Sequence, residues 1–154
     1  MVPWQASDAE VVAAALISLP AMSPTRLRHA LSQRGPEELW RDISNGRSHV
    51  REVLSRGDIQ QAATAAQGFD FDELRTALHV NSIRVLTVAD IHYPEALQSD
   101  VDRPPVLFVR GDLSLLERRI AAIVGTRRAT AAGRATAKEL AQEIASAGIT
   151  VVSG

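Results

Sequence analysis

Residues 118–154, RRIAAIVGTRRATAAGRATAKELAQEIASAGITVVSG, carry the clearest structural pattern in the chain. The apolar run Ile120–Val124 is too short for a helix and stops at a glycine, which is typical of a strand buried on both faces. Apolar residues then recur at helical spacing, with Thr130 as the expected N-cap and Gly148 at the expected left-handed end. A second β-branched run follows at Ile149–Val152. The pattern predicts a βαβ unit with parallel strands and a right-handed crossover.

A ligand site is predicted where these two strands end. In open α/β sheets, ligands collect beyond the carboxyl ends of the strands, which here are Gly125–Arg128 and Ser153–Gly154. The first segment also precedes a helix N-terminus, which favours an anion. Its glycine permits close approach of a phosphate, Thr126 offers a hydroxyl, and Arg127 and Arg128 offer planar guanidinium groups. The stretch lacks the further glycines of GxGxxG and the GK[ST] of a P-loop, so it indicates a phosphate site of neither common nucleotide type.

Positive charge is concentrated in the same stretch. Residues 118–154 contain two acidic side chains and six basic ones, namely Arg118, Arg119, Arg127, Arg128, Arg134 and Lys138, whereas the whole chain has a net charge of −1. Local concentration of this kind is expected of a nucleic-acid-binding surface, in which Arg134 and Lys138 would support the loop. Arginines at a strand end are as often a solvated rim, so charge alone leaves both interpretations open.

The first 80 residues predict a small bundle of short helices. Helix start signals occur at Ser7, Ser23–Pro24, Gly35–Pro36, Asp58 and Asp70, and Val50–Leu54 suggests a further helix. Leu16–Leu31 is faintly similar to a helix-hairpin-helix, a motif that grips DNA phosphates through a glycine-containing turn. Its turn, Pro20–Ser23, contains no glycine and includes a proline without an N–H. A packing or protein-docking role is therefore favoured over DNA contact for this segment.

Residues 81–117 connect the two parts and predict two more strands. These are Ile83–Val88 and Val106–Val109, the second as a neighbour of the parallel strands. Asp100–Asp102 has too few oxygens nearby for a hard cation, and the four histidines lack metal-ligand spacing, so no metal site and no cofactor are predicted. No serine lies in GxSxG and no nucleophile is paired locally with a histidine, so no catalytic residue is predicted.

The composition favours a cytoplasmic protein of one or two domains. The chain has 154 residues, 45% of them apolar, which is enough for an ordinary packed core. Cysteine is absent, which suits a reducing compartment and excludes disulfides and thiolate metal sites. No basic-then-apolar signal segment opens the sequence, and no apolar run approaches the roughly 18 residues of a membrane span. We therefore expect no membrane partner.

Several linked motifs between residues 90 and 154 resemble the DNA-processing protein A (DprA/Smf) family. They are Tyr93–Pro94, Pro104–Leu107, Arg110–Asp112 and Ile123–Arg127, in the family's order and spacing. The resemblance implies a sterile-alpha-motif-like (SAM-like) helical domain at residues 1–80, followed by a Rossmann-like parallel-sheet domain at residues 81–154 that is incomplete at its C-terminus. Such proteins are not enzymes. They bind single-stranded DNA and load the RecA recombinase onto it in natural transformation and recombination, with a homodimer as a further expectation for the full-length form.

The resemblance also implies roles for individual residues. Arg127 would contact phosphate in a pocket lined by Gly125, Thr126, Ser153 and Gly154. Ala132 stands where the family usually has an aromatic residue, so base stacking is not expected there. The family continues beyond this point with a glycine-rich stretch, whereas this sequence stops at Gly154, and we expect a truncated form.

Two other functions stay open at this point. Related Rossmann-like proteins bind nucleotides in the same crevice, and some cleave the N-glycosidic bond of nucleoside monophosphates. Their PGGxGT stretch and catalytic glutamate do not occur in this sequence. The other alternative is an inactive fragment with an incomplete sheet. For the chain as given, we expect residues 1–80 alone to unfold cooperatively as a monomer. Residues 81–154 alone should be aggregated or molten, because the missing part of the sheet would leave apolar strand surface exposed.

Overall fold

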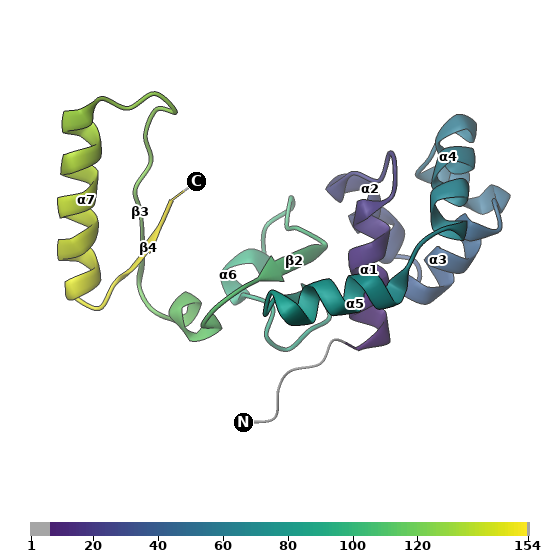
Figure 1. Cartoon of the computed structure of the whole chain (residues 1–154), viewed down its shortest axis with the longest axis horizontal. Helices are drawn as coiled ribbons and strands as arrows, with labels where there is room; N and C mark the ends of the chain where they lie inside the picture. Colours follow the sequence, from purple (N-terminus) through teal and green to yellow (C-terminus); the bar gives the residue numbers. More distant parts are fainter. Residues whose placement is uncertain (1–6, 154) are drawn as a thin grey trace. The chain divides into compact units, whose positions relative to one another are not determined.

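The computed structural model describes residues 7–153, without the side chains of Ser48 and His49 (Figure 1). Within that range it contains seven α-helices, two 3₁₀ helices and four strands. The predicted α/β class is confirmed, with helices first and a short parallel sheet near the C-terminal end. Contacts divide the chain into two compact units between Gly111 and Asp112. Each unit is described by itself below.

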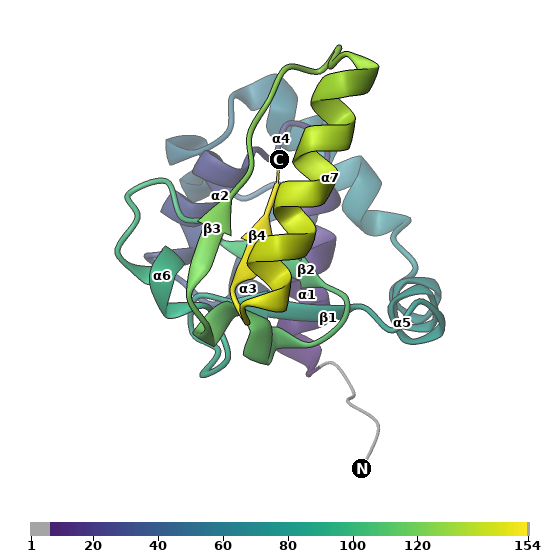
Figure 2. The same ribbon diagram turned by 90° about the vertical axis from the view of Figure 1, so that its left-hand side faces the viewer.

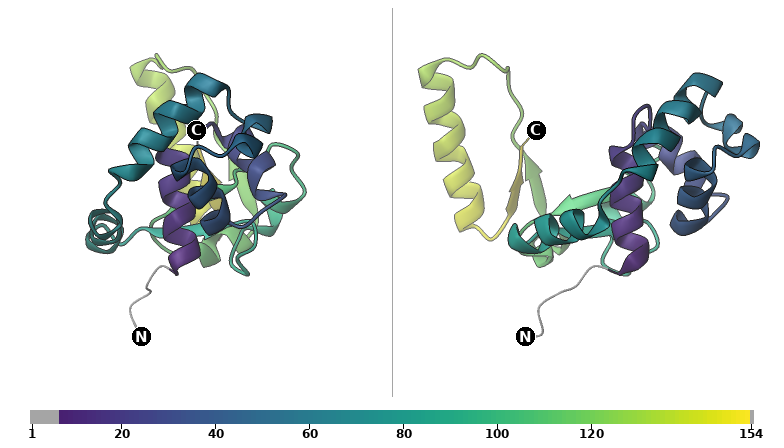
Figure 3. Two further views of the ribbon diagram at one scale, coloured as in Figure 1. Left: turned by 90° about the vertical axis from the view of Figure 1, so that its right-hand side faces the viewer. Right: turned by 45° about the vertical axis from the view of Figure 1, so that its right-hand side comes forward.

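The first unit is built on a helical bundle. Its helices are α1 (Asp8–Ser18), α2 (Pro24–Leu31), α3 (Pro36–Ser44), the 3₁₀ helix η1 (Ser48–Glu52), α4 (Arg56–Gln67) and α5 (Phe71–Val80). Helix α1 contacts α2, α3 and α5, and in Figure 3 it lies, in purple, between α5 and the α3–α4 pair. The fully buried side chains include Leu16, Leu27, Leu39 and Ile43, one or more from each of α1, α2 and α3. Burial of these leucines and isoleucines supplies the main driving force for the bundle.

Most of the predicted helix starts are confirmed by hydrogen bonds to side chains. Ser7 Oγ accepts from the Glu10 N–H at 3.3 Å, and the Glu10 carboxylate accepts from the Ser7 N–H at 2.6 Å. The Ser23 side chain caps α2 by accepting from the Arg26 N–H, and the Asp70 side chain caps α5 by accepting from the N–H groups of Asp72 and Glu73. Such caps satisfy N–H groups that the helix itself leaves unpaired.

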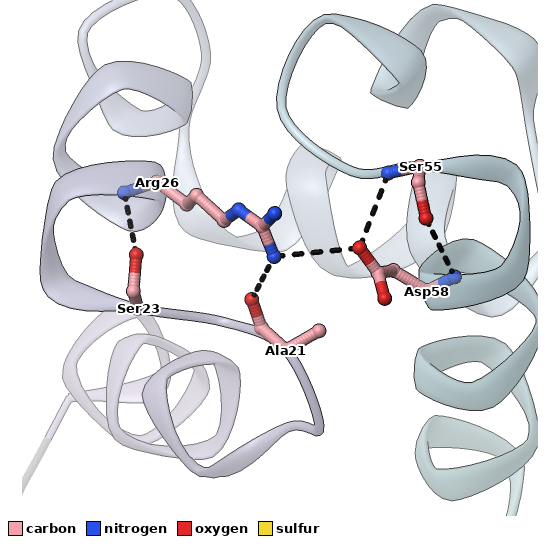
Figure 4. Close-up of polar contacts among 5 residues, drawn as sticks. All are labelled: Ala21, Ser23, Arg26, Ser55 and Asp58. Atoms are coloured by element: carbon pink, nitrogen blue, oxygen red, sulfur yellow. Dashed lines mark hydrogen bonds and ion pairs between the residues drawn. The ribbon is translucent and has the colours of Figure 1, made fainter.

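One predicted cap was wrong. Asp58 does not cap α4, because Ser55 is the N-cap and Asp58 is the third helical residue of a capping box (Figure 4). The further helix suggested around Val50 is present as the short 3₁₀ helix η1. Either Ser55 or Asp58 can accept the N–H groups of a first turn, so the pattern alone does not choose between them.

A two-stranded antiparallel sheet completes the first unit. It consists of β1 (Arg84–Thr87) and β2 (Val106–Val109), with the short helix α6 (Glu95–Gln98) between them. Val85 and Val106 belong to the same buried cluster as the bundle side chains. This strand pairs with β1 in the antiparallel direction and buries Val106 with the bundle, while its expected place beside the parallel strands stays a prediction. The predicted domain boundary after residue 80 stays a prediction.

The second unit is the predicted βαβ unit. It contains the 3₁₀ helix η2 (Leu113–Glu117), β3 (Ile120–Ala122), α7 (Ala131–Ser146) and β4 (Thr150–Val152). The strands are parallel, with Ile120 opposite Thr150, and the Ile123 N–H donates to Val152 O at 2.9 Å. Helix α7 packs along β4 (Figure 2). No described residue from 112 to 153 is buried, so this unit has no closed core of its own.

Candidate nucleic-acid interface

Thr130 caps the N-terminus of α7. Thr130 has an extended backbone, and its Oγ1 accepts from the Gly133 N–H at 3.1 Å. This confirms the predicted cap, and the φ of +77° at Gly148 confirms the predicted left-handed residue after the helix. Helix geometry leaves the N–H groups of Ala131 and Ala132 without an intrahelical partner. These two groups and the helix dipole form a positive end directly after the predicted phosphate loop.

The loop Gly125–Arg128 is exposed along its whole length. Thr126 Oγ1 accepts from the Arg128 N–H at 3.0 Å, which shapes a local turn and leaves the hydroxyl hydrogen free to donate. Within residues 7–153, neither Arg127 nor Arg128 uses its guanidinium in an ion pair or a hydrogen bond. Two charged forks are therefore available to an external anion.

Gly125 has no structural neighbour that requires glycine. A Cβ built at this position meets no atom within 4 Å, and the residue does not have a positive φ. The fold would therefore accept alanine here. The absence of a side chain becomes useful only if something outside the chain approaches the backbone closely.

Arg134 braces the loop rather than extending freely from it. Its Nη1 donates to Ala129 O at 2.6 Å, across the junction between loop and helix. Sequence reasoning identified Arg134 as a supporting cation but missed this bond, because an i to i−5 contact from a side chain to a carbonyl has no recognised spacing signal. Lys138 lies one turn further along α7 and is exposed. Arg134 thus fixes the approach to the helix, while Lys138 adds charge behind it.

Ser153 lies at the same end of the unit as the loop. The register places Val152 opposite Ala122, so the residues after both strands leave from one edge. The 16 residues of α7 span about 24 Å, whereas a three-residue strand spans about 10 Å. The connection from β3 to α7 consequently runs on past the end of β4, as Figures 1 and 3 show. Gly154 lies outside the described residues, and a shared phosphate pocket stays a prediction.

Charge is distributed unevenly along the second unit. No residue from 118 to 138 is acidic, and Glu139 and Glu143 lie in the later turns of α7. Arg118 and Arg119 precede β3, so the strand separates them from the loop at its other end. The cations around Gly125–Arg128 therefore form one exposed group without a neighbouring carboxylate in the loop itself.

Among residues 7–153, no three histidine, aspartate or glutamate side chains gather closely enough to hold a metal ion. None of the described helices is both long and apolar enough to cross a membrane.

Comparison with known proteins places this loop within a region that matches a family profile. Residues 84–154 match the sequence profile of the family described as DNA recombination-mediator protein A. The DNA processing protein DprA of Bacillus subtilis (strain 168) is 34% identical over 112 residues. The chain belongs to the DNA-processing protein A family. The aligned residues make up 70% of this chain but only 38% of the Bacillus protein, so this chain spans well under half of that relative. The part that matches the DNA-processing protein A profile begins at β1 and includes β3, the loop and α7.

Proposed function

We propose that this chain binds the phosphate backbone of single-stranded DNA at Gly125–Arg128 and the N-terminus of α7. The observation that carries this proposal is the pair of unengaged guanidinium groups, Arg127 and Arg128, placed directly before the capped end of α7. A helix N-terminus and two arginine forks each favour a phosphate, and here they act at one place. The loop supplies no amide or aromatic side chain to read a base, so we expect binding with little sequence preference.

The proposed role is to load the RecA recombinase onto that DNA during DNA uptake and recombination. This step rests on membership of the DNA-processing protein A family, as does the proposal of a homodimer for the full-length form. A loading protein must hold a polymer while leaving it accessible, and the exposed loop suits that requirement. A hydrolase for nucleoside monophosphates would instead need a site that encloses its substrate. We therefore propose a binding function without catalysis.

The first experiment compares two arginines of the same unit. Arg127→Ala should weaken binding to a dT oligonucleotide by about tenfold at low salt, because a charge-assisted contact to phosphate is lost. The slope of log affinity against log salt should become shallower by about 0.7, the value for one phosphate of a single strand. Arg119→Ala removes the same charge from the opposite end of β3 and should change neither quantity to this extent.

The outcomes of this comparison are distinct. Equal effects of both substitutions would mean general electrostatic attraction and no localised site. An unchanged affinity and slope for Arg127→Ala would remove Arg127 from the interface. Gly125→Ala adds a methyl group that meets no atom of the chain, so a weaker affinity with an unchanged fold would point to close approach of the phosphate.

A competition experiment separates binding from catalysis. Oligo-dT should displace a labelled oligonucleotide far better than dTMP or AMP, because the polymer makes several phosphate contacts at once. No free base should be released from either monophosphate. Measurable base release that is lost in Arg127→Ala would favour the enzyme.

A further inference from the structure

A cavity of about 460 Å³ opens within the first unit. It lies between the turn joining α2 to α3, the end of β1 and the segment before β2. Its lining combines apolar groups with three guanidinium groups, and includes Leu31, Val88, Pro105, Arg28, Arg34 and Arg103. The volume falls in the range of about 300 to 1,000 Å³ that is usual for small-ligand sites.

Among the three arginines that line the cavity, Arg28 forms an ion pair with an exposed carboxylate, Asp102. Its Nη2 lies 2.9 Å from Asp102 Oδ1, and its Nη1 donates to Arg103 O at 3.1 Å. These two bonds tie α2 to the segment before β2. We therefore assign Arg28 to holding the two walls of the cavity together.

Arg34 shares its carboxylate partner with another arginine. Its Nη1 lies 3.6 Å from Asp42 Oδ2, while Arg47 Nη1 lies 3.1 Å from Asp42 Oδ1. Asp42 is only 1% exposed, so one buried carboxylate faces two guanidinium groups. A positive charge is left in excess beside the cavity.

Arg103 contributes a second excess charge. Its Nη1 lies 3.2 Å from Gln98 O and 3.4 Å from Asp100 O, which are neutral main-chain acceptors. No carboxylate of residues 7–153 forms an ion pair with it. Moreover, Arg103 Nε is buried and donates no hydrogen bond within the described part of the chain, whereas Arg34 Nη1 faces Asp42. Arg34 and Arg103 both line the cavity, and their incompletely balanced charges favour a ligand that supplies anionic oxygens.

We propose that this cavity binds a nucleoside monophosphate group, with the phosphate held by Arg34 and Arg103. The cavity is larger than a bare phosphate requires, and Leu31, Val88 and Pro105 offer apolar surface for a sugar and base. Guanidinium planes also stack favourably on nucleobases. The group can belong to a free mononucleotide or to the phosphorylated end of a DNA strand, since both present the same chemistry. All the residues involved belong to the first unit, so this site does not depend on the loop Gly125–Arg128.

The test titrates the complete chain with dTMP, thymidine and inorganic phosphate, and follows the amide signals of Leu31 and Val88 by proton–nitrogen NMR. Saturable shifts are expected with dTMP. The two fragments of that ligand should each bind about tenfold or more weakly, because each lacks either the charged contacts or the apolar ones. Thymidine or phosphate binding as tightly as dTMP would overturn the proposal, as would the absence of saturation with all three.

Substitutions test whether the amide shifts caused by dTMP come from binding in the cavity. Arg103→Gln should weaken dTMP binding by about tenfold, whereas Arg56→Gln removes an exposed charge that does not line the cavity and should leave binding unchanged. If Arg103→Gln disturbs the fold, Ala89→Phe fills the cavity from an exposed position on its rim. Retention of wild-type dTMP binding by Ala89→Phe would overturn the proposal.

Two further titrations show whether the nucleotide is free or part of a strand, and whether the cavity binds it independently of the loop Gly125–Arg128. A 5′-phosphorylated oligo-dT that shifts Leu31 and Val88, when its unphosphorylated form does not, indicates a strand end. Shifts with dTMP but with neither oligonucleotide indicate a free mononucleotide. Arg127→Ala should retain these shifts even if it loses oligonucleotide binding. Their loss in Arg127→Ala would place the nucleotide at the loop and overturn the cavity site.

Discussion

Arg26 and Asp58 connect the turn after α1 to the first turn of α4 (Figure 4). Arg26 Nη1 donates to Ala21 O at 2.7 Å and lies 3.4 Å from Asp58 Oδ2. Ala21 has a φ of +63°, a conformation that costs an alanine free energy. The same Asp58 oxygen accepts from the Ser55 N–H at 3.3 Å and so completes the capping box of α4. One ion pair therefore links a strained turn to a helix cap.

We expect the two partners of this ion pair to contribute unequally to stability. Asp58→Ala should lower the free energy of unfolding by about 1 to 2 kcal/mol, because a cap and an ion pair are both lost. Arg26→Ala should cost about 1 kcal/mol, mainly through the bond to Ala21 O. Urea unfolding of both variants and of the double variant should give a coupling energy of about 0.5 kcal/mol. Strict additivity would show that the pair itself contributes nothing.

Removing the cap of α7 should destabilise the start of that helix. Thr130→Ala loses the hydrogen bond from the Gly133 N–H and should reduce the stability of the helix by about 1 kcal/mol. Thr130→Ser keeps the hydroxyl and should stay close to the wild type. Amide exchange of Gly133 and Arg134 measures the effect, since fraying accelerates exchange in the first turn. Equal exchange in the alanine and serine variants would mean that the hydroxyl does not hold this turn.

Asp112 gives a pH-dependent contribution with a defined sign. Hydrogen bonds from the Ser114 side chain and from its N–H, the latter at 2.9 Å, lower the pKa of the Asp112 carboxyl below 3.8. Because the folded pKa is the lower one, its stabilisation is complete above the unfolded pKa of about 3.9 and is lost as the pH falls through the folded pKa. A carbon-13 NMR titration should place the Asp112 midpoint below 3.8.

The cause of this pKa shift can be tested by one substitution. Ser114→Ala removes the side-chain donor and should move the Asp112 pKa upward toward its ordinary value. Ser146→Ala removes a hydroxyl at the end of α7 and should leave it unchanged. A midpoint that stays in place in Ser114→Ala would assign the lowered pKa to the backbone N–H and the charge of Arg118.

Fragments should show which parts of the chain fold alone. Residues 1–111 should unfold cooperatively and at higher urea than residues 1–80, because Val85 and Val106 are buried in the same cluster as the bundle. Residues 112–154 should lack dispersed amide signals, since no described residue of that unit is buried. Equal stability of residues 1–111 and residues 1–80 would place the folding boundary after residue 80. A dispersed spectrum from residues 112–154 would show that packing of α7 on β4 is sufficient for folding.

Features that depend on near neighbours along the chain could be predicted from the amino-acid pattern. The capping box of Ser7 and Glu10, the cap at Thr130 and the left-handed Gly148 each involve residues within a few positions of one another. The βαβ unit was equally predictable, because a short apolar run, a helical period and a second β-branched run follow directly along the chain. The exposed loop after β3 could be placed for the same reason.

The pairing and clustering of distant segments could not be predicted in this way, because they depend on packing across the whole first unit. The strand Val106–Val109 has the same apolar pattern whether it pairs in parallel or antiparallel, and burial of Val85 and Val106 with the bundle selects the antiparallel partner β1. The arginines of the cavity lie up to 75 positions apart, so no sequence spacing could bring Arg28, Arg34 and Arg103 together. Long-range contacts form only when the free energy of burial exceeds the cost of closing the chain between them, and that balance is a property of the whole unit.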